Sequence, residues 1–320
     1  MLTFLVFISS SILLYILYRV VSRNNQVSAQ AELVNLVLGV FKPRYLLKKV
    51  FMNPPRTDMP LRASKKFSTK YNTAYHVIDG TELMTANSRN TENNIHLIYF
   101  HGGAYVLGKN GVKGKESFIS RLIDSTGAKV TFVDYPVAPE SKYNQTLEKV
   151  YEAYVYLSAE YSRDEVVLVG DSAGGGLALS LAQVIQEWHS VRCPEKIVLF
   201  SPWLDISLEN PKINEQENKD MILSKEALQY AAEKYSEPMD FKKPIVSPIY
   251  GDFSELGSIL MFFGSYELFF VDGLRMQRIA ETDNLDISFH FYDEMPHDWV
   301  IFPIPESKKA LQEACEFILK

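Results

Sequence analysis

Short apolar runs alternate with segments of helical periodicity along most of the chain. Each run is continuous, as in strands that are buried on both faces of a parallel sheet. The segments between them repeat apolar residues at the three- and four-residue spacing of a helix that packs on a core. The pattern predicts strands at 95–100, 130–133, 166–169, 197–200, 259–263 and 287–291, and helices at 117–123, 146–161, 177–188, 273–281 and 306–319. This alternation predicts an α/β fold, with a mostly parallel central sheet and helices on both faces.

The region before the first of these strands is less regular. Residues 30–50 repeat apolar residues at helical spacing, so one helix is expected there. Residues 52–70 are polar and contain three prolines, which favours an irregular connection. Residues 71–85 fit a hairpin that turns at Asp79-Gly80. We therefore treat 23–85 as a connecting and cap region and 86–320 as the main domain.

A long excursion interrupts the alternation at about 203–252. It lies between two predicted strands, has a charged turn at 210–220 and has a helical pattern at 225–235. Insertions of this length most often cover a binding or catalytic site. We predict a helical cap here; a surface helix without such a role would give the same pattern.

The first segment, 1–22, is strongly apolar, and Met1 to Tyr18 contain no charged side chain. As a helix these residues would span about 27 Å, close to the thickness of a bilayer core. The basic residues near the segment all follow it, which predicts a membrane anchor with the folded body in the cytoplasm. A cleaved secretory signal, a helix packed on the folded body and a soluble cytoplasmic protein are the alternatives.

Composition narrows the classes of protein that the chain can belong to. The 320 residues are 47% hydrophobic with a net charge of −6, so a sizeable core is expected and nucleic acid is not an expected partner. The two cysteines, Cys193 and Cys315, are far apart and have no metal-ligand spacing. We expect both to be buried thiols without a disulfide. The oligomeric state is left open.

The clearest chemical signal is a Gly-x-Ser-x-Gly turn between a predicted strand and a predicted helix. Gly170, Ser172 and Gly174 follow the strand at 166–169 directly. A nucleophile elbow needs this order, because the serine must project from a tight turn at the top of the sheet. A glycine-rich turn with an incidental serine is the alternative. We predict that Ser172 is a nucleophile.

A serine nucleophile needs a base, and three histidines follow Ser172. His189 falls at the far end of the elbow helix, and His290 lies within a predicted strand. His297 follows the last predicted strand, in a loop at the carboxyl end where catalytic residues gather. We therefore predict that His297 is the base; capping of the next helix is its alternative role.

The base in turn needs an orienting acid, which should follow the strand at 259–263. Glu267 is the first carboxylate after that strand, and Asp272 is the competing candidate. Asp298 is adjacent to the histidine and is not expected to reach its ring. We predict that Glu267 is the acid.

Negative charge on a reacting carbonyl oxygen calls for fixed backbone amides. Ala173 directly follows the nucleophile, and its amide is one candidate. Gly102, Gly103 and Ala104 follow the strand at 95–100 in the run His101 to Tyr105. We predict an oxyanion hole at these positions, with an ordinary tight turn as the alternative for the glycine pair.

Four motifs together resemble the hormone-sensitive-lipase-like branch of the α/β-hydrolase fold. They are His101 to Tyr105, Asp134 to Glu140, Gly170 to Gly175 and Met295 to His297. The resemblance implies hydrolysis of small carboxylic esters through an acyl-enzyme, with no cofactor and no metal, beneath a helical cap. It places the amides of Gly103 and Ala104 at the oxyanion, although many relatives have a third glycine where this chain has Ala104.

Other functions remain open on sequence grounds. Relatives often carry aspartate where Glu267 stands, and the longer side chain would need a backbone set slightly further back. The same fold also serves peptidases and amide hydrolases, membrane-lipid lipases, and ligand receptors that lack the base. Tyr105, Trp203 and Phe269 are candidates for an apolar substrate site, or for the core.

Overall fold

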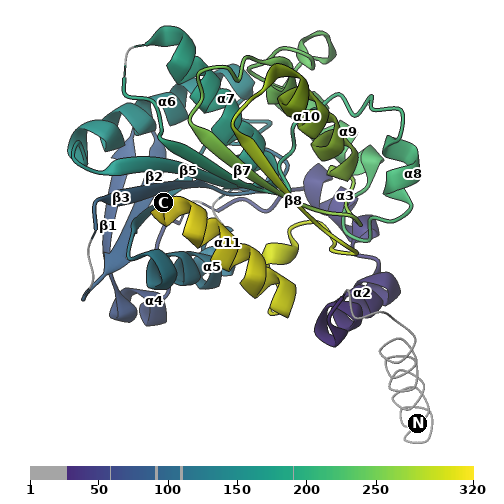
Figure 1. The fold of residues 1–320 in the computed structure, drawn as a ribbon, viewed down its shortest axis with the longest axis horizontal. Helices are drawn as coiled ribbons and strands as arrows, with labels where there is room; N and C mark the ends of the chain where they lie inside the picture. The colour runs from purple at the N-terminus through teal and green to yellow at the C-terminus, as the bar shows by residue number, and fades with distance from the viewer. Residues whose placement is uncertain (1–26, 58, 91–92, 109–110, 190) are drawn as a thin grey trace, which may run out of the picture.

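The computed structural model describes residues 27–57, 59–90, 93–108, 111–189 and 191–320 (Figure 1). These residues form an eight-stranded sheet in the order β1-β2-β4-β3-β5-β6-β7-β8. The strands are β1 (Tyr71–Ile78), β2 (Thr81–Ser88), β3 (Ile95–Phe100), β4 (Lys129–Asp134), β5 (Glu165–Asp171), β6 (Lys196–Phe200), β7 (Ser258–Gly264) and β8 (Ile287–Tyr292). Strands β3 to β8 are mutually parallel, and β2 pairs antiparallel with β1 and β4. The predicted α/β class, parallel strands and hairpin are confirmed.

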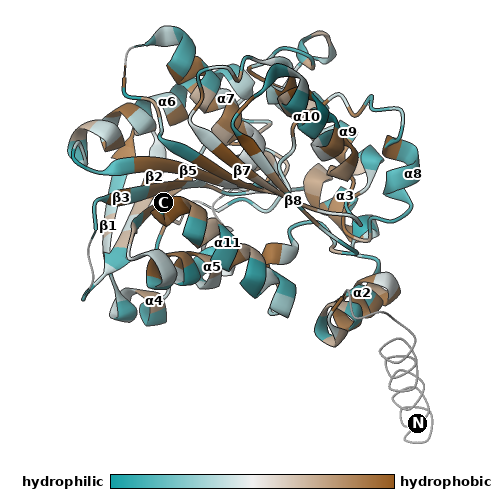
Figure 2. Ribbon diagram, viewed as in Figure 1, coloured by the Kyte–Doolittle hydropathy of each residue, from teal (hydrophilic) through white to brown (hydrophobic). Residues whose placement is uncertain are grey.

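Helices cover both faces of the sheet, as the continuous apolar strands require (Figures 1 and 2). Along β3, Leu97 and Tyr99 point into one core and Ile98 and Phe100 into the other, because successive side chains of a strand alternate. Helices α5 (Gly111–Thr126) and α11 (Pro305–Leu319) cover the first face, and α6 (Tyr143–Glu160), α7 (Ser172–Trp188) and α10 (Phe270–Asp283) cover the second. The resulting layers bring the carboxyl ends of β3, β5 and β7 to one edge.

Two expectations for the region before the sheet are wrong. The single helix expected at 30–50 is two helices, α2 (Ala29–Phe41) and α3 (Arg44–Met52), because Lys42 adopts a left-handed conformation and Pro43 cannot continue a helix. The segment expected to be irregular ends in a short helix, α4 (Lys65–Lys70), whose first turn is capped by the Ser64 hydroxyl.

The insertion after β6 contains α8 (Ile213–Glu217), α9 (Lys225–Tyr235) and the short helices η1 (Pro238–Asp240) and η2 (Pro248–Tyr250). The predicted helix at 225–235 is confirmed, and α8 lies inside the expected charged turn. Helix α9 packs against α3, so the insertion and the N-terminal helices form one layer. That layer adjoins the loop after β7, since the Asp220 carboxylate accepts a hydrogen bond from the Leu268 amide at 2.7 Å. A cap over this edge stays a prediction.

The structure tests the expectation for the two cysteines, but not the one for the apolar N-terminal segment. Cys315 is buried and free, as expected, but Cys193 is free and only half-buried. The expectation of two buried thiols is therefore wrong for Cys193, which lies in the connection between α7 and β6. The apolar segment 1–18 lies outside the described residues. Within those residues, no helix has both the length and the apolar character needed to cross a membrane.

Candidate active site

Ser172 lies on the tight turn between β5 and α7. Its φ is +53°, a conformation that non-glycine residues rarely adopt and that costs free energy unless the surroundings hold it. The close approach of α7 to β3 provides that support: a Cβ at Gly174 would collide with the Phe100 carbonyl oxygen. The Ser172 carbonyl also accepts a hydrogen bond from the Trp203 amide at 2.9 Å. The strand-turn-helix order in the sequence therefore produces a strained turn that presents the serine.

The structure brings together the three side chains proposed for catalysis. Ser172 Oγ lies 2.9 Å from His297 Nε2, and Glu267 Oε2 lies 2.7 Å from His297 Nδ1. All three residues are buried. They come from the carboxyl ends of β5, β7 and β8, which adjoin the same edge of the parallel sheet. The geometry allows the hydroxyl to donate to the imidazole while the ring donates to the carboxylate.

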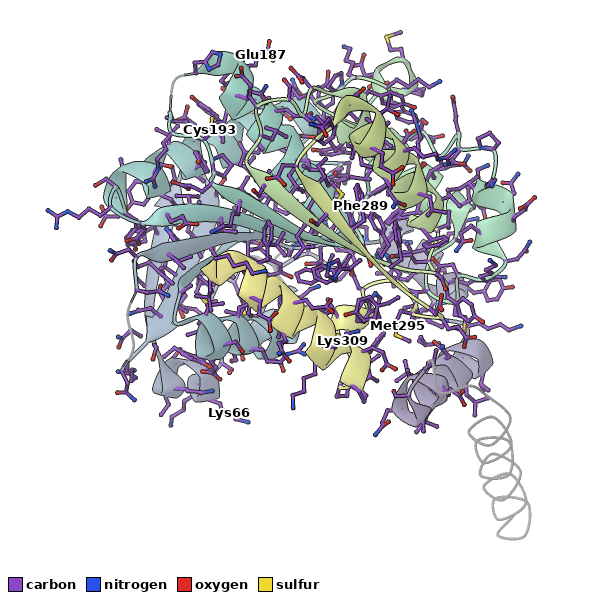
Figure 3. All side chains as sticks on the ribbon, in the orientation of Figure 1. Lys66, Glu187, Cys193, Phe289, Met295 and Lys309 are labelled. Carbon is purple, nitrogen blue, oxygen red and sulfur yellow. The ribbon has the colours of Figure 1, made fainter. Side chains whose placement is uncertain are left out.

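Glu267 is held by the loop between β7 and α10. Its second oxygen, Oε1, accepts from the Gly264 amide at 2.7 Å. The loops after β7 and β8 are joined, because the Tyr266 amide donates to the carbonyl of Met295 at 3.0 Å. Met295 itself is fully buried in the core that α11 covers (Figure 3). The competing carboxylate, Asp272, is instead hydrogen-bonded to Asn210 Nδ2 at 2.8 Å.

Two residues of the insertion support this loop and were missed in the sequence. The Asp220 carboxylate accepts hydrogen bonds from the backbone amides of Ile222, Leu223 and Leu268. Gln216 Nε2 donates to the Glu267 carbonyl at 3.0 Å. Burial raises the pKa of Asp220 to about 6. Neither residue carries a motif, because its role depends on where the insertion folds back over the sheet.

Asp298 lies closer to the site than the sequence suggested. Its Oδ2 is 3.7 Å from His297 Nε2, so the expectation that it would not reach the ring is wrong. The reason is its backbone: φ is +53°, which turns the side chain back over its neighbour. Burial raises the pKa of Asp298 to about 7, while its other oxygen, Oδ1, is buried without a hydrogen-bond partner among the described residues.

A buried ion pair lies beneath the elbow. Asp171 Oδ2 is 2.5 Å from Lys115 Nζ, in the first turns of α5, and Oδ1 accepts from the Tyr99 hydroxyl. Burial opposes the charge of Asp171, but Lys115 and the Tyr99 hydrogen bond outweigh it and keep the pKa of Asp171 below its ordinary value. A Cβ at Gly102 would lie 2.5 Å from Asp171 Oδ2. The ion pair therefore supports both the nucleophile turn and the loop opposite it.

That loop, His101 to Tyr105, has an unusual backbone. Gly103, Ala104 and Tyr105 have φ values of 132°, 53° and 61° in succession. The Gly103 carbonyl accepts hydrogen bonds from the next turn, and the His101 carbonyl accepts from the Tyr135 hydroxyl at 2.6 Å. Gly102 lies directly against the elbow. The amide of Ala173 lies in the first turn of α7, where helix amides have no partner within the helix.

The aromatic residues near the site belong to the core. Tyr105, Trp203 and Phe269 are fully buried. Tyr105 and Phe269 each stack on Trp203, with ring centroids 5.7 and 5.6 Å from it. The Phe269 ring also meets His297 edge-on at 5.1 Å. These contacts place the three rings in the core, with Phe269 against the imidazole.

The other candidate histidines lie elsewhere. His189 follows α7 at its C-terminus, and His290 lies on β8, where its Nδ1 is 2.7 Å from Glu313. Among the residues that the structure describes, no group of His, Cys, Asp and Glu is arranged to hold a metal ion. The site thus consists of a serine, an imidazole and carboxylates.

The carboxylates around His297 should give the rate of the reaction an unusual dependence on pH. Burial alone would disfavour the imidazolium, but the charges of Asp298 and Glu267 outweigh it and raise the pKa of His297 to about 9. If His297 is the base, as predicted, it must be unprotonated, so kcat/KM is expected to fall as pH drops through that pKa. Asp298→Asn removes one negative charge and should move this acidic limb to lower pH by about 1 unit or more. Rate measurements between neutral and alkaline pH test the shift.

Asp293→Asn is the matched control for this prediction, because Asp293 is an exposed carboxylate in the same loop. Its acidic limb should coincide with that of the unmodified protein. A limb that stays in place in Asp298→Asn would show that Asp298 does not influence the ring.

Comparison with known proteins agrees with this geometry. A family model described as the alpha/beta hydrolase fold matches residues 97–301, which include the elbow and the loops that carry Glu267 and His297. The chain belongs to this family. An esterase of Acinetobacter venetianus is 30% identical over 225 residues, which cover 69% of this chain and 73% of that protein. An acetyl-hydrolase of Streptomyces hygroscopicus is also 30% identical, over 69% of this chain and 74% of its own length.

Solved structures of this hydrolase family show the same fold. The crystal structure of an esterase from the bacterial hormone-sensitive lipase family has a TM-score of 0.74 and 24% sequence identity. The match covers 91% of this chain and 98% of that one. The resemblance drawn from the four motifs is thereby confirmed for the family and the fold.

Proposed function

We propose that this hydrolase is a serine carboxylesterase that cleaves carboxylic esters through an acyl-enzyme. The observation that carries the proposal is the unbroken chain of contacts from Ser172 Oγ through His297 to Glu267, at 2.9 and 2.7 Å. The names of the two relatives, an esterase and an acetyl-hydrolase, support ester hydrolysis. Small-molecule esters are the proposed substrates.

In the proposed mechanism, Ser172 Oγ attacks the ester carbonyl carbon and gives its proton to His297 Nε2. Glu267 accepts the Nδ1 proton in a hydrogen bond, which fixes the ring and stabilises the imidazolium. The amides of Gly103, Ala104 and Ala173 stabilise the oxyanion, each by about 3 kcal/mol. His297 then protonates the leaving alcohol, and water enters by the same steps to release the acid. Gly102 shapes the turn that presents these amides.

Covalent labelling tests the nucleophile. A fluorophosphonate probe should label the unmodified protein, and Ser172→Ala should abolish the labelling. Ser180→Ala is the control, because Ser180 is a buried serine on the same helix whose hydroxyl donates to the Pro244 carbonyl at 3.5 Å. Labelling that persists in Ser172→Ala would contradict the proposal. Hydrolysis of matched esters and anilides of graded acyl length would then separate an esterase from an amide hydrolase.

Replacing the proposed acid should lower the catalytic rate less than replacing the proposed base. Glu267→Ala is expected to leave a small residual activity, about 10⁴-fold below normal, because the serine and histidine remain and only the orientation of the ring is lost. Asp272→Asn should retain nearly full activity, since Asp272 is bonded to Asn210 and not to the ring. Steady-state rates decide between the two carboxylates: a severe loss in Asp272→Asn with activity retained in Glu267→Ala would reverse the assignment.

We also infer that residues 1–18 anchor the protein to a membrane, with the hydrolase domain in the cytoplasm. The support is the uncharged apolar run and the basic residues that follow it, Arg19 and Arg23. Fractionation of the full chain tests this: release by salt or alkaline carbonate would contradict an integral anchor.

A further inference from the structure

Helix α2 turns an apolar stripe toward solvent. Leu33, Val37, Val40 and Phe41 recur at the spacing of one helix face, and they are 43%, 44%, 70% and 78% exposed. Tyr45 and Leu46, in the first turn of α3 just after α2, are each 63% exposed. Surface helices normally bury their apolar face, so this arrangement is the reverse of the usual one. We call these six residues the α2–α3 apolar surface.

The rest of α2 is fixed to the protein, so the orientation of the stripe is built in. The Ser28 amide and hydroxyl donate to the Glu306 carboxylate at 2.6 and 2.8 Å, which ties the start of α2 to α11. Asn35 Nδ2 donates to the Glu294 carbonyl at 2.8 Å, and Ala31 is buried on the same side. These contacts use the inner face and leave the apolar stripe outside. Figure 2 shows α2 at the rim of the molecule, with apolar positions along it.

Charge distinguishes this region from the remainder of the chain. The first 56 residues contain seven Lys and Arg and one acidic residue, Glu32, which is buried in α2. The whole chain nevertheless has a net charge of −6. Lys42 and Lys49 are exposed beside the apolar surface. Exposed apolar side chains with basic neighbours are the combination that binds anionic lipid headgroups and the acyl chains beneath them.

Other occupants fit less well. A second copy of the chain would bring the same lysines together across a two-fold axis, where they repel. The chain's own first 26 residues carry Arg19 and Arg23 and no acidic residue, so they offer no complementary charge. The described chain starts at Val27, next to Ser28, the N-cap of α2. Residues 19–28, which include Arg19 and Arg23, join the apolar run 1–18 to α2.

We propose that the α2–α3 apolar surface lies in the interfacial layer of an anionic lipid bilayer. Phe41, Val40 and Leu46 enter the region of the acyl chains, while Lys42 and Lys49 face the headgroups. This contact is separate from the anchor inferred for residues 1–18, since it involves folded helices whose inner faces hold the hydrolase domain. It also orients the layer formed by α3 and α9 toward the membrane.

A tryptophan placed in the surface tests the contact directly. In the full chain, Phe41→Trp adds a tryptophan to this surface. Vesicles of equal parts phosphatidylcholine and phosphatidylserine with brominated acyl chains should quench the fluorescence of that tryptophan. Met239→Trp is the matched control, because Met239 is 88% exposed on η1, outside this surface. Its added fluorescence should not be quenched, even when residues 1–18 hold the protein on the vesicle. The unmodified protein supplies the background of the native tryptophans.

The variants separate the possible outcomes without any measurement of hydrolysis. Quenching of Phe41→Trp but not of Met239→Trp supports the proposal, provided that adding Lys42→Glu and Lys49→Glu weakens that quenching at least tenfold in protein that stays on the vesicles. Absence of quenching while the protein remains on the vesicles overturns it. A Phe41→Trp emission that is already blue-shifted without vesicles also overturns it. If that shift depends on protein concentration, a second copy covers the surface; if it does not, the chain's own N-terminal segment does.

Discussion

Replacing His297 by alanine should lower kcat on the order of 10⁶-fold, because serine and histidine act as one unit in such sites. In the proposed mechanism the ring takes the serine proton and later gives it to the leaving group, so no other group replaces it. Asp298 lies 3.7 Å from the ring nitrogen that faces the serine, but no direct contact with Ser172 connects it to the nucleophile. Steady-state kinetics on an activated ester measure the loss.

Two further variants make this result interpretable. His297→Gln keeps a hydrogen-bonding side chain near Glu267, so it should fold even if the alanine variant leaves that buried carboxylate poorly satisfied. It should be as inactive as His297→Ala. His290→Ala is the matched control: His290 lies on β8 and bonds to Glu313, away from the serine, and its loss should change kcat by less than about threefold. A His297 variant that retains a hundredth of the normal rate would exclude this residue as the base.

The parallel core was predictable because its physical requirement is visible in sequence. Strands buried on both faces must be apolar throughout, so runs such as 166–169 and 259–263 mark them directly. The proposed site residues follow from the same logic, since catalytic groups gather where these strands end. Ser172, Glu267 and His297 each lie in the loop or turn just after such a strand, and the structure brings them into contact.

What the sequence did not predict depends on contacts between distant segments or on local backbone conformation. Apolar periodicity continues across Pro43, so it hid the break between α2 and α3. The left-handed conformation of Asp298 is what turns its carboxylate back toward His297. Asp220 and Gln216 act through hydrogen bonds to a loop that lies close only after the insertion has folded. None of these features leaves a periodic pattern or a motif.

The pair Lys115 and Asp171 is another contact of this kind, and removing the lysine should have the largest effect on stability. Lys115→Met would leave the Asp171 carboxylate buried with the Tyr99 hydroxyl as a remaining partner. Removing one member of a buried pair costs about 3–5 kcal/mol, because the other charge stays uncompensated. We therefore expect the free energy of unfolding at pH 8, measured in urea, to fall by about that amount.

The pH dependence identifies the cause of this loss. Without Lys115, the pKa of Asp171 in the folded state should rise above its unfolded value, so the carboxylate is penalised only where it is charged. The loss of stability should then shrink as pH falls from 8 toward 5, whereas a loss due to packing would stay constant. Adding Asp171→Leu to Lys115→Met should recover most of the stability, since an apolar pair tolerates burial.

Lys66→Met is the matched control, because Lys66 is an exposed lysine that projects from α4 (Figure 3). It should change the free energy of unfolding by less than about 0.5 kcal/mol. A loss in Lys115→Met as small as that of the control would mean that Asp171 needs no cation beneath the elbow. The strained φ of Ser172 would then be held by the close packing of α7 on β3 and by the Trp203 amide alone.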